Sequence, residues 1–477
     1  MSSIGIIVFI LLLAAVVWLQ LQRDFIRGLS CAMFIWVSMT TFLRIDLPGS
    51  LPELTIHRLL LILVLIAWIR KGGMAKLASV PLLGYFAFWA MANLVSLAGT
   101  QIDFVISLKR VLDFVLEVFA AYIITATSLK TREDVLRVLR AAWLGLLVVA
   151  VFAVIERYTG FNPVDRYIPG YAREDVQFRD ILSTFQHRIL LGTALAMGVP
   201  LSFLPLRSRK RVDEGGAVFW GTLSLLVAGC YFSFSRGPWL GLALAFVILA
   251  FLGSTKIRSR LAIIGVIAGL ILVVRPGVLE TIGGFAKDTA DTDSFKGGTF
   301  QYRLELWRVA ASEVSKSAWT MLFGYGPGAG SVMEIERELS YRGRYQKIES
   351  WDNHFAYALF QSGYVGLLAT LVLYLKALVP MLIAARNPGN PNRELQACLF
   401  AAAFVQVWMM TNVLVFAKQL DYLFWTLVAS GFVLSSRAEF SRSPSAAPMP
   451  EHESGNDVEP SLSDVDCPQC KLTALSK

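Results

Sequence analysis

Long hydrophobic runs alternate with short polar connections along most of the chain. Residues 4–19 read IGIIVFILLLAAVVWL without a charged side chain, and residues 217–234, 237–252 and 261–274 are similarly apolar. A helix that crosses the hydrocarbon core of a membrane needs about 20 predominantly apolar residues. The pattern therefore predicts an all-α polytopic membrane protein with about 12–13 transmembrane helices. The spans are predicted near 4–21, 26–43, 55–69, 80–98, 104–127, 135–155, 189–205, 217–234, 237–252, 260–275, 355–384, 396–415 and 421–436.

The connections between these runs differ in lysine and arginine content, which predicts the orientation in the membrane. Connections near 99–103 and 416–421 have few positive charges, whereas one alternate set is basic. We expect the basic set to be cytoplasmic and 156–188, 233–238 and 276–354 to lie outside. The basic set comprises Arg70, Lys71 and Lys76; Lys130, Arg132 and Arg137; Arg207, Arg209, Lys210 and Arg211; Lys256, Arg258 and Arg260; Arg386 and Arg393.

This topology divides the chain into four parts. Residues 1–275 carry the first transmembrane helices and the outer loop 156–188, and residues 276–354 form a large periplasmic loop. Residues 355–437 carry the last transmembrane helices, and 438–477 are expected to be a disordered cytoplasmic tail. Within the large loop, 299–317 have apolar positions at helical spacing, while 333–347 are predicted to be a second helix or a mobile loop.

Composition agrees with a membrane protein and excludes several other classes. Hydrophobic residues make up 55% of the chain and charged residues only 17%, compared with about 25% charged residues in soluble domains. The sequence contains no P-loop, dinucleotide-binding glycine motif or HExxH motif, so no cofactor, metal or nucleic acid is predicted. Cys467 and Cys470 form a single CxxC in the tail, without the second pair that a zinc site usually has.

A polar break between two hydrophobic runs contains a candidate anion site. In SFSRG, Ser233, Ser235, Arg236 and Gly237 stand together where the chain must reverse. Hydroxyl groups and free N–H groups at a helix N-terminus can bind an anion together with a guanidinium group. Pro238 suits the first turn of the helix that follows. An arginine that only reaches the membrane surface is the alternative interpretation.

Two further candidates lie in the large loop. Arg303 is on the expected helix, with Trp307 one turn later, so both side chains can face the membrane surface. His354 stands where the loop enters a spanning helix, next to Asp352 and Asn353, which are expected to orient its ring and raise its basicity. A structural role is the simpler interpretation for a single histidine or an isolated Arg–Trp pair.

Four segments resemble motifs of the O-antigen ligase and polymerase superfamily, and they occur in that family's order. SFSRGPWLGLALAF (233–246) resembles its SRG-plus-aromatic motif, and GYGPGAG (324–330) resembles the glycine-rich segment of its outer loop. DNHFAYALFQSGYVGLL (352–368) resembles its motif of His and Asn, and FQHRILLGTALAM (185–197) resembles the segment that leads into a span with LG.

The resemblance implies a glycosyltransferase C-like architecture and a metal-independent enzyme of the bacterial inner membrane. Such an enzyme moves a glycan from a polyprenyl diphosphate carrier to lipid A–core or to another glycan on the periplasmic side. By motif, Arg236 and Arg303 become the diphosphate clamp, with Arg188 and Ser235 assisting. His354 becomes the base that activates the acceptor hydroxyl, with Asp352 as the other catalytic candidate.

Two other classes of function remain open at this stage. A transporter for an anion or small solute should have charged residues near span midpoints and inverted repeats. No clear repeat is visible, and the midpoint candidates Lys109, Arg110, Asp113 and Glu117 are expected to pair with each other along one helix. A structural scaffold would not explain the outer arginine motifs.

Overall fold

The structure, a computed structural model, describes most of the predicted membrane region. It covers residues 3–45, 53–162, 164, 181–204, 215–274, 277, 280, 283–284, 287, 295–339, 344–348, 350–415 and 418–440. The tail with its CxxC motif and most of the outer loop 156–188 lie outside the described residues.

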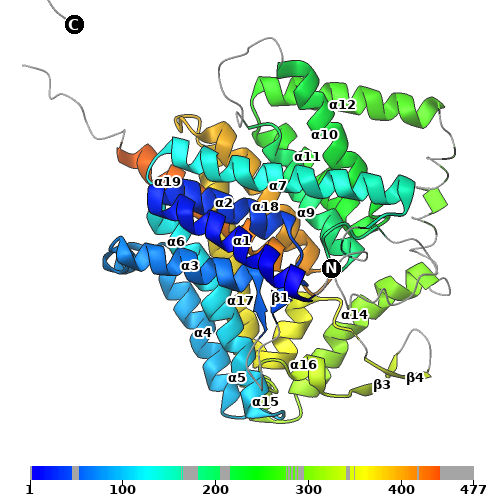
Figure 1. Cartoon of the computed structure of the whole chain (residues 1–477). Coiled ribbons are helices and arrows are strands. Elements are labelled where there is room, and N and C mark those ends of the chain that lie inside the picture. Colours follow the sequence, from blue (N-terminus) through cyan, green and yellow to red (C-terminus); the bar gives the residue numbers. More distant parts are fainter. Residues whose placement is uncertain are drawn as a thin grey trace, which may run out of the picture.

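Helices account for nearly all of the described chain, which confirms the all-α polytopic fold (Figure 1). Each predicted span is occupied by a helix. The first half contains α1 (Ser3–Arg23), α2 (Phe25–Ser38), α3 (Ile56–Arg70), the 3₁₀ helix η1 (Gly73–Ser79), α4 (Leu83–Leu97), α5 (Phe104–Asp113), the π-helical turn η2 (Phe114–Phe119), α6 (Ala120–Ser128) and α7 (Arg132–Thr159). The second half contains α9 (Arg188–Leu201), α10 (Gly215–Phe232), α11 (Arg236–Leu252), α12 (Thr255–Val274), α17 (His354–Arg386), α18 (Arg393–Met410) and α19 (Lys418–Phe440).

Length and apolar composition alone identify only some of these helices as spans. Within the described chain, five helices are long and apolar enough to cross a membrane. The number rises to six if η1 and α4, which meet at 89°, count as one broken span. Among the others, α2, α9, α10 and α11 are apolar but too short for this criterion, and local thinning of the bilayer accommodates such lengths.

The large loop has a small hydrophobic core of its own, seated on the first turns of α17. It contains α14 (Phe295–Val314), α15 (Ala318–Phe323), α16 (Ala329–Val332) and a hairpin of β3 (Glu336–Leu339) and β4 (Arg344–Lys347). The helix expected within 299–317 is present as α14. Buried side chains from α14, including Leu306 and Val309, pack with Phe360 of α17. The loop is therefore anchored to the helix that begins at His354.

The hairpin corrects the prediction of a helix or a mobile loop over 333–347. Its strands pair antiparallel, with Glu336 opposite Lys347 and Leu339 opposite Arg344. Ile335 and Ile348 flank the hairpin, are both buried, and are joined by a hydrogen bond from Ile348 N to Ile335 O (2.8 Å). Burying both isoleucines against the loop core fixes the two segments side by side, which a charged helix could not do. A second, short pair of strands, β1 (Arg44–Ile45) and β2 (Leu54–Thr55), connects α2 to α3.

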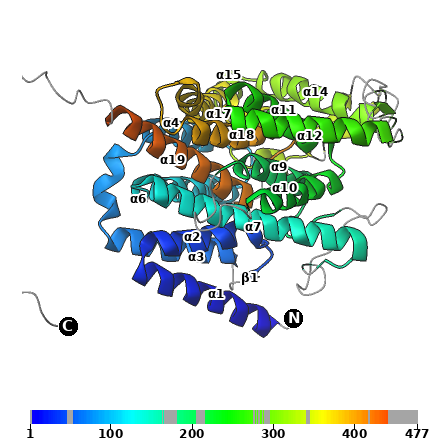
Figure 2. The ribbon, with the colours of Figure 1, turned by 90° about the horizontal axis from the view of Figure 1, so that it is seen from above.

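The connections predicted to be outside meet at one end of the bundle. Gln101 N donates to Tyr325 O (2.9 Å), and Gln419 Nε2 donates to Thr184 O (3.2 Å). At the other end, Arg137 pairs with Asp24 (3.1 Å), and Ser254 Oγ donates to Glu394 (3.1 Å); Arg137, Ser254 and Glu394 belong to or adjoin basic connections that were predicted to be cytoplasmic. Figures 1 and 2 show α14 at one end and the final turns of α19 at the other. In the described part of the chain, these contacts join predicted outer connections to each other and basic connections to their own end; Arg207, Arg209, Lys210 and Arg211 lie outside the described residues.

Candidate functional site

The SFSRG turn is a strained reversal between α10 and α11. Phe234 has a φ of 47°, a left-handed conformation that is costly for a residue with a large side chain. Cys230 O closes the turn, because it accepts hydrogen bonds from Ser233 Oγ (2.7 Å) and Trp239 Nε1 (3.1 Å). Ser235 occupies the N-cap position of α11 without a side-chain capping bond, and Arg236 is the first helical residue. Pro238 lies in the first turn, as predicted.

The LG motif at the start of α9 packs directly against this turn. A Cβ atom at Gly192 would come within 2.6 Å of Ser233 Oγ and 2.9 Å of Pro238 Cβ. Glycine is therefore required for the two segments to approach this closely. Arg188, the first residue of α9, precedes Gly192 by one turn and so lies on the same helix face. The structure thereby brings the Arg188 helix end to the Arg236 turn.

Arg303 reaches the same place from α14 in the large loop. Its Nε donates to Asn412 O (2.7 Å) at the end of α18, and a Cβ atom on Gly237 would touch Asn412 Cβ at 4.0 Å. Burial lowers the pKa of the Arg303 guanidinium group; neighbouring Asp352 raises this pKa and Arg236 lowers it further. Arg303 and the start of α11, which carries Arg236, therefore approach the same residue, Asn412, from distant segments.

The residues just before α17 differ from the predicted arrangement. Asp352 accepts a hydrogen bond from Ser350 Oγ (2.5 Å) and lies 3.8 Å from Arg303 Nη2. Asn353 caps α17, because its Oδ1 accepts from Phe355 N (3.1 Å) and Ala356 N (3.0 Å). The prediction that both side chains orient the ring of His354 is therefore wrong, since each is engaged elsewhere. Among the described residues, buried His354 Nδ1 has no hydrogen-bond partner.

The glycine-rich segment is shaped to fit a kink in α17. Ser362 and Gly363 have non-helical dihedral angles, which frees carbonyl groups one turn earlier. Tyr325 N donates to Phe360 O (3.1 Å), and Gly326 N donates to Gln361 O (2.9 Å). Gly324 and Gly326 adopt φ values of 71° and 104°, and a side chain at Gly324 would overlap the backbone at Gln361. GYGPGAG thus fixes the part of α17 that precedes the kink and begins with His354.

His354 lines a cavity of 440 Å³ beside this segment. The cavity lies at the end of the bundle where the predicted outer connections meet. Its walls combine aromatic rings with hydrogen-bonding and charged groups of both signs. The polar and aromatic lining residues are Trp89, Asn93, Arg110, Asp113, Phe114, Ser331, His354, Tyr357, Gln361, Ser362, Thr370, Tyr374, Lys418 and Asp421.

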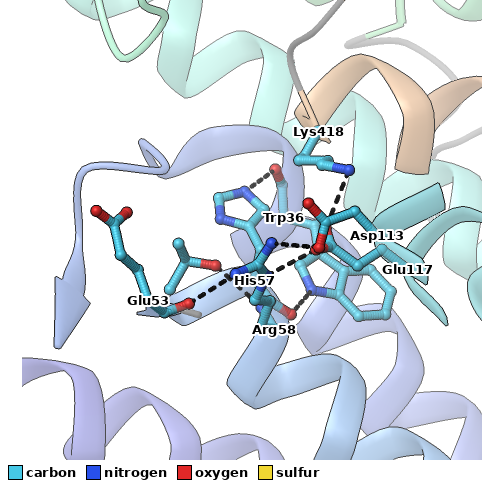
Figure 3. A network of polar contacts seen from close by, with 8 residues as sticks. Trp36, Glu53, His57, Arg58, Asp113, Glu117 and Lys418 are labelled. Atoms are coloured by element: carbon cyan, nitrogen blue, oxygen red, sulfur yellow. Dashed lines mark hydrogen bonds and ion pairs between the residues drawn. The ribbon is translucent and has the colours of Figure 1, made fainter. Parts of the chain in front are cut away.

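A network of ion pairs adjoins the cavity, and two of its members, Asp113 and Lys418, line the cavity wall (Figure 3). Arg58 of α3 lies between Asp113 Oδ1 (2.9 Å) and Glu117 Oε1 (2.7 Å), and Lys418 reaches Glu117 Oε2 (3.3 Å). Asp113 and Glu117 were predicted to pair with basic residues of their own helix. This prediction is wrong, because Arg58 of α3 and Lys418 of α19 are their partners. The π-helical turn η2 begins directly after Asp113, so the two carboxylates sit at a local irregularity of the span.

The sequence did not single out Arg58 or Lys418 as neighbours of the site. The available signal was the presence of two carboxylates in an otherwise apolar span, since such groups need partners inside the bundle. Of the predicted site residues, the structure brings Arg236, Arg303 and Asp352 together. His354 follows Asp352 by two positions and faces the cavity. Among the described residues, no group of three or more His, Cys, Asp or Glu side chains is placed to hold a metal ion.

Residues 221–371 match the sequence model of a family described as O-antigen ligase. This region belongs to the O-antigen ligase and polymerase superfamily. The match spans the SFSRG turn, Arg303, the glycine-rich segment and His354, whereas Arg188 and Arg58 lie before it. No curated protein matches the sequence. Membership of the O-antigen ligase family supports a role as a membrane glycan ligase that acts on lipid-linked glycans, and it gives no support to a transporter.

Proposed function

We propose that the protein transfers a glycan from a polyprenyl diphosphate carrier to a lipid or glycan acceptor at the periplasmic face of the inner membrane. The observation that carries this proposal is the convergence of Arg236 and Arg303. They come from different segments and both lie beside Asn412, because Arg303 donates to its carbonyl oxygen and the backbone at Gly237, next to Arg236, lies against its side chain. A diphosphate would supply the negative charge that Asp352, 3.8 Å from Arg303, supplies only in part.

In the proposed reaction the acceptor hydroxyl oxygen attacks the anomeric carbon of the donor sugar. The bond between that carbon and the diphosphate oxygen breaks, and its electron pair leaves with the diphosphate. Arg236 and Arg303 stabilise the charge that develops, with Arg188 and Ser235 at the edge of the clamp. The acceptor proton passes to His354.

His354 suits the role of base for two structural reasons. Its buried Nδ1 has no hydrogen-bond partner in the described part of the chain, so the ring is not committed to a structural bond. The ring also lines the cavity, where aromatic and hydrogen-bonding side chains suit a sugar. We therefore place the acceptor in the cavity and the donor diphosphate on the Arg303 side of His354.

The test is transfer of a labelled glycan by purified variants, with donor binding measured separately. Arg236→Lys is expected to lower transfer by about 10²–10³-fold, because one ammonium group cannot reproduce the bidentate contacts of a guanidinium group. Arg308→Lys is the matched control, since Arg308 is on the same helix as Arg303, 74% exposed and paired with Glu305. Near wild-type transfer by Arg236→Lys would remove the clamp assignment.

A further inference from the structure

Basic side chains surround a second hollow, at the end of the bundle opposite to the candidate site. It has a volume of 610 Å³ and lies where α1, α3 and α6 end and where α2 and α7 begin. Its basic residues are Arg23, Lys71, Lys76 and Lys130. The distribution of lysine and arginine predicts this end to be cytoplasmic.

The acidic residues beside this basic hollow are already engaged. Asp24 accepts from Ile26 N (2.9 Å) and pairs with Arg137 (3.1 Å) and Arg27 (3.6 Å). Asp134 Oδ2 accepts from the backbone of Lys130 (3.1 Å) and Thr131 (2.9 Å), which caps α7. Both carboxylates line the hollow and keep their charge, so four basic and two acidic side chains leave it with a net charge of +2.

The basic residues themselves have no carboxylate partner in the described part of the chain. Lys71 lies 5.6 Å from the centre of the Phe25 ring, and Arg23, Lys76 and Lys130 make no ion pair with a described residue. Four positive charges against two negative ones leave an excess of positive charge around one concave space, which an added anion would offset. The hollow therefore has the charge of a site for a phosphate group.

The surroundings place this charge at the level of a membrane surface. The 3₁₀ helix η1, which carries Lys76, meets α4 at 89° and so runs across the end of the bundle rather than along it. Met74 on the same helix is 55% exposed, and α1 ends at Arg23 after a run of exposed apolar side chains such as Leu12 and Leu19. A ligand in the hollow would place its charged group among the lysines. The exposed apolar surface of α1 would lie next to that ligand.

We propose that the basic hollow binds the phosphate of an anionic phospholipid from the cytoplasmic leaflet. The ammonium and guanidinium groups bind the phosphate oxygens, and the acyl chains lie along the exposed apolar face of α1. Basic pockets between helices on this side of a membrane suit anionic headgroups, because that leaflet carries the anionic lipids. This site is separate from the proposed glycan transfer and does not depend on it.

The test is native mass spectrometry of the full-length protein in neutral detergent, titrated with phosphatidylglycerol or with phosphatidylcholine. We expect the protein to retain phosphatidylglycerol and not phosphatidylcholine. The triple variant Lys71→Gln, Lys76→Gln, Lys130→Gln is expected to bind phosphatidylglycerol about a hundredfold more weakly. The triple variant with Arg at the same positions keeps the charge and should retain the lipid, which separates loss of binding from loss of folding.

A matched control distinguishes this site from general attraction to negative charge. The variant Lys256→Gln, Arg258→Gln, Arg260→Gln removes the same number of charges from another basic connection and should bind as the wild type does. Equal losses in both Gln variants, or no loss in the first, would overturn the proposal. A large excess of inorganic phosphate should not displace the lipid; displacement would show a site for free phosphate instead.

Discussion

Arg58 and Arg303 are two arginines with similar burial and different surroundings. Their side chains are 23% and 18% exposed, and both lie at the end of the bundle where the predicted outer connections meet. Arg58 is held by two carboxylates at 2.7 and 2.9 Å, and Lys418 shares one of them, Glu117. Arg303 has one carboxylate at 3.8 Å and another arginine nearby.

The difference separates a structural arginine from one that can bind a ligand. A guanidinium group that two carboxylates already satisfy has little left to offer an anion, and its removal leaves buried charges without a partner. A guanidinium group beside a second positive charge keeps its hydrogen-bonding capacity and gains from an added anion. The following predictions test whether this contrast holds, from the largest expected effect to the smallest.

Arg58→Ala should destabilise the fold by about 3–4 kcal/mol, because Glu117 then loses its closest partner inside the bundle. Thermal or denaturant unfolding of the purified protein in detergent measures this change. Arg137→Ala, which removes an exposed pair with Asp24, is the control and should cost about 1 kcal/mol or less. If Arg58→Ala unfolds like the wild type but cannot transfer glycan, the Arg58 network belongs to the reaction and the contrast fails.

His354→Ala should lower turnover by about 10²-fold while leaving donor binding largely intact. A base acts on the acceptor, whereas the arginines act on the donor, so the two kinds of variant should differ in the step that they impair. Single-turnover transfer and a separate donor-binding assay distinguish them. Full turnover in His354→Ala would leave the family assignment standing and would move the base to another residue, with Asp352 the next to test.

Asp352→Asn should lower kcat by about 10-fold without raising KM for the donor. The amide can still accept from Ser350 but no longer attracts Arg303, so we expect Arg303 to be held less firmly in place. Removing a negative charge beside the clamp should not weaken the binding of an anionic donor. A loss as large as that of His354→Ala would instead identify Asp352 as the base.

Chelation with EDTA should leave transfer unchanged, since the arginines are expected to carry the positive charge that stabilises the leaving diphosphate. The measurement is the transfer rate before and after EDTA, followed by addition of single divalent ions. Complete loss that one divalent ion restores would rule out the proposed mechanism. That result would also mean that Arg58 and Arg303 differ in local packing only, and not in their ability to bind the donor diphosphate.

Much of the fold follows from local sequence, because a hydrophobic run in a membrane has few alternatives to a helix. The same holds for the SFSRG turn, where Pro238 and the polar residues before it mark a helix start. The hairpin in the large loop could not be predicted from local sequence, since its register depends on burying Ile335 and Ile348 against α14 and α17. Charged residues at 336–347 give no local sign of that packing.

The sequence could predict which residues form the candidate site. It could not predict which side chains contact one another there. Arg236, Arg303 and His354 each stand in a motif, so the sequence could name them. The partners of Asp352 and Asn353 depend on where α14 and the backbone of α17 lie. Likewise, the pairing of Arg58 with Asp113 and Glu117 joins positions more than fifty residues apart in sequence. A helical repeat within a single span cannot reveal such contacts.

The π-helical turn between α5 and α6 gives the span a length that cannot be changed freely. A π turn contains one residue more than an α-helical turn over the same stretch of backbone. Deleting Leu116 would remove the extra residue and let this stretch become α-helical, with α5 and α6 keeping their relative orientation. Inserting one residue after Phe119 would instead rotate the part before it by about 100° relative to the rest of α6. Arg110 and Asp113 would then leave the cavity and Arg58, although neither residue had been replaced. Insertions within 104–128 should therefore be more harmful than deletion of a single residue from the π-helical turn.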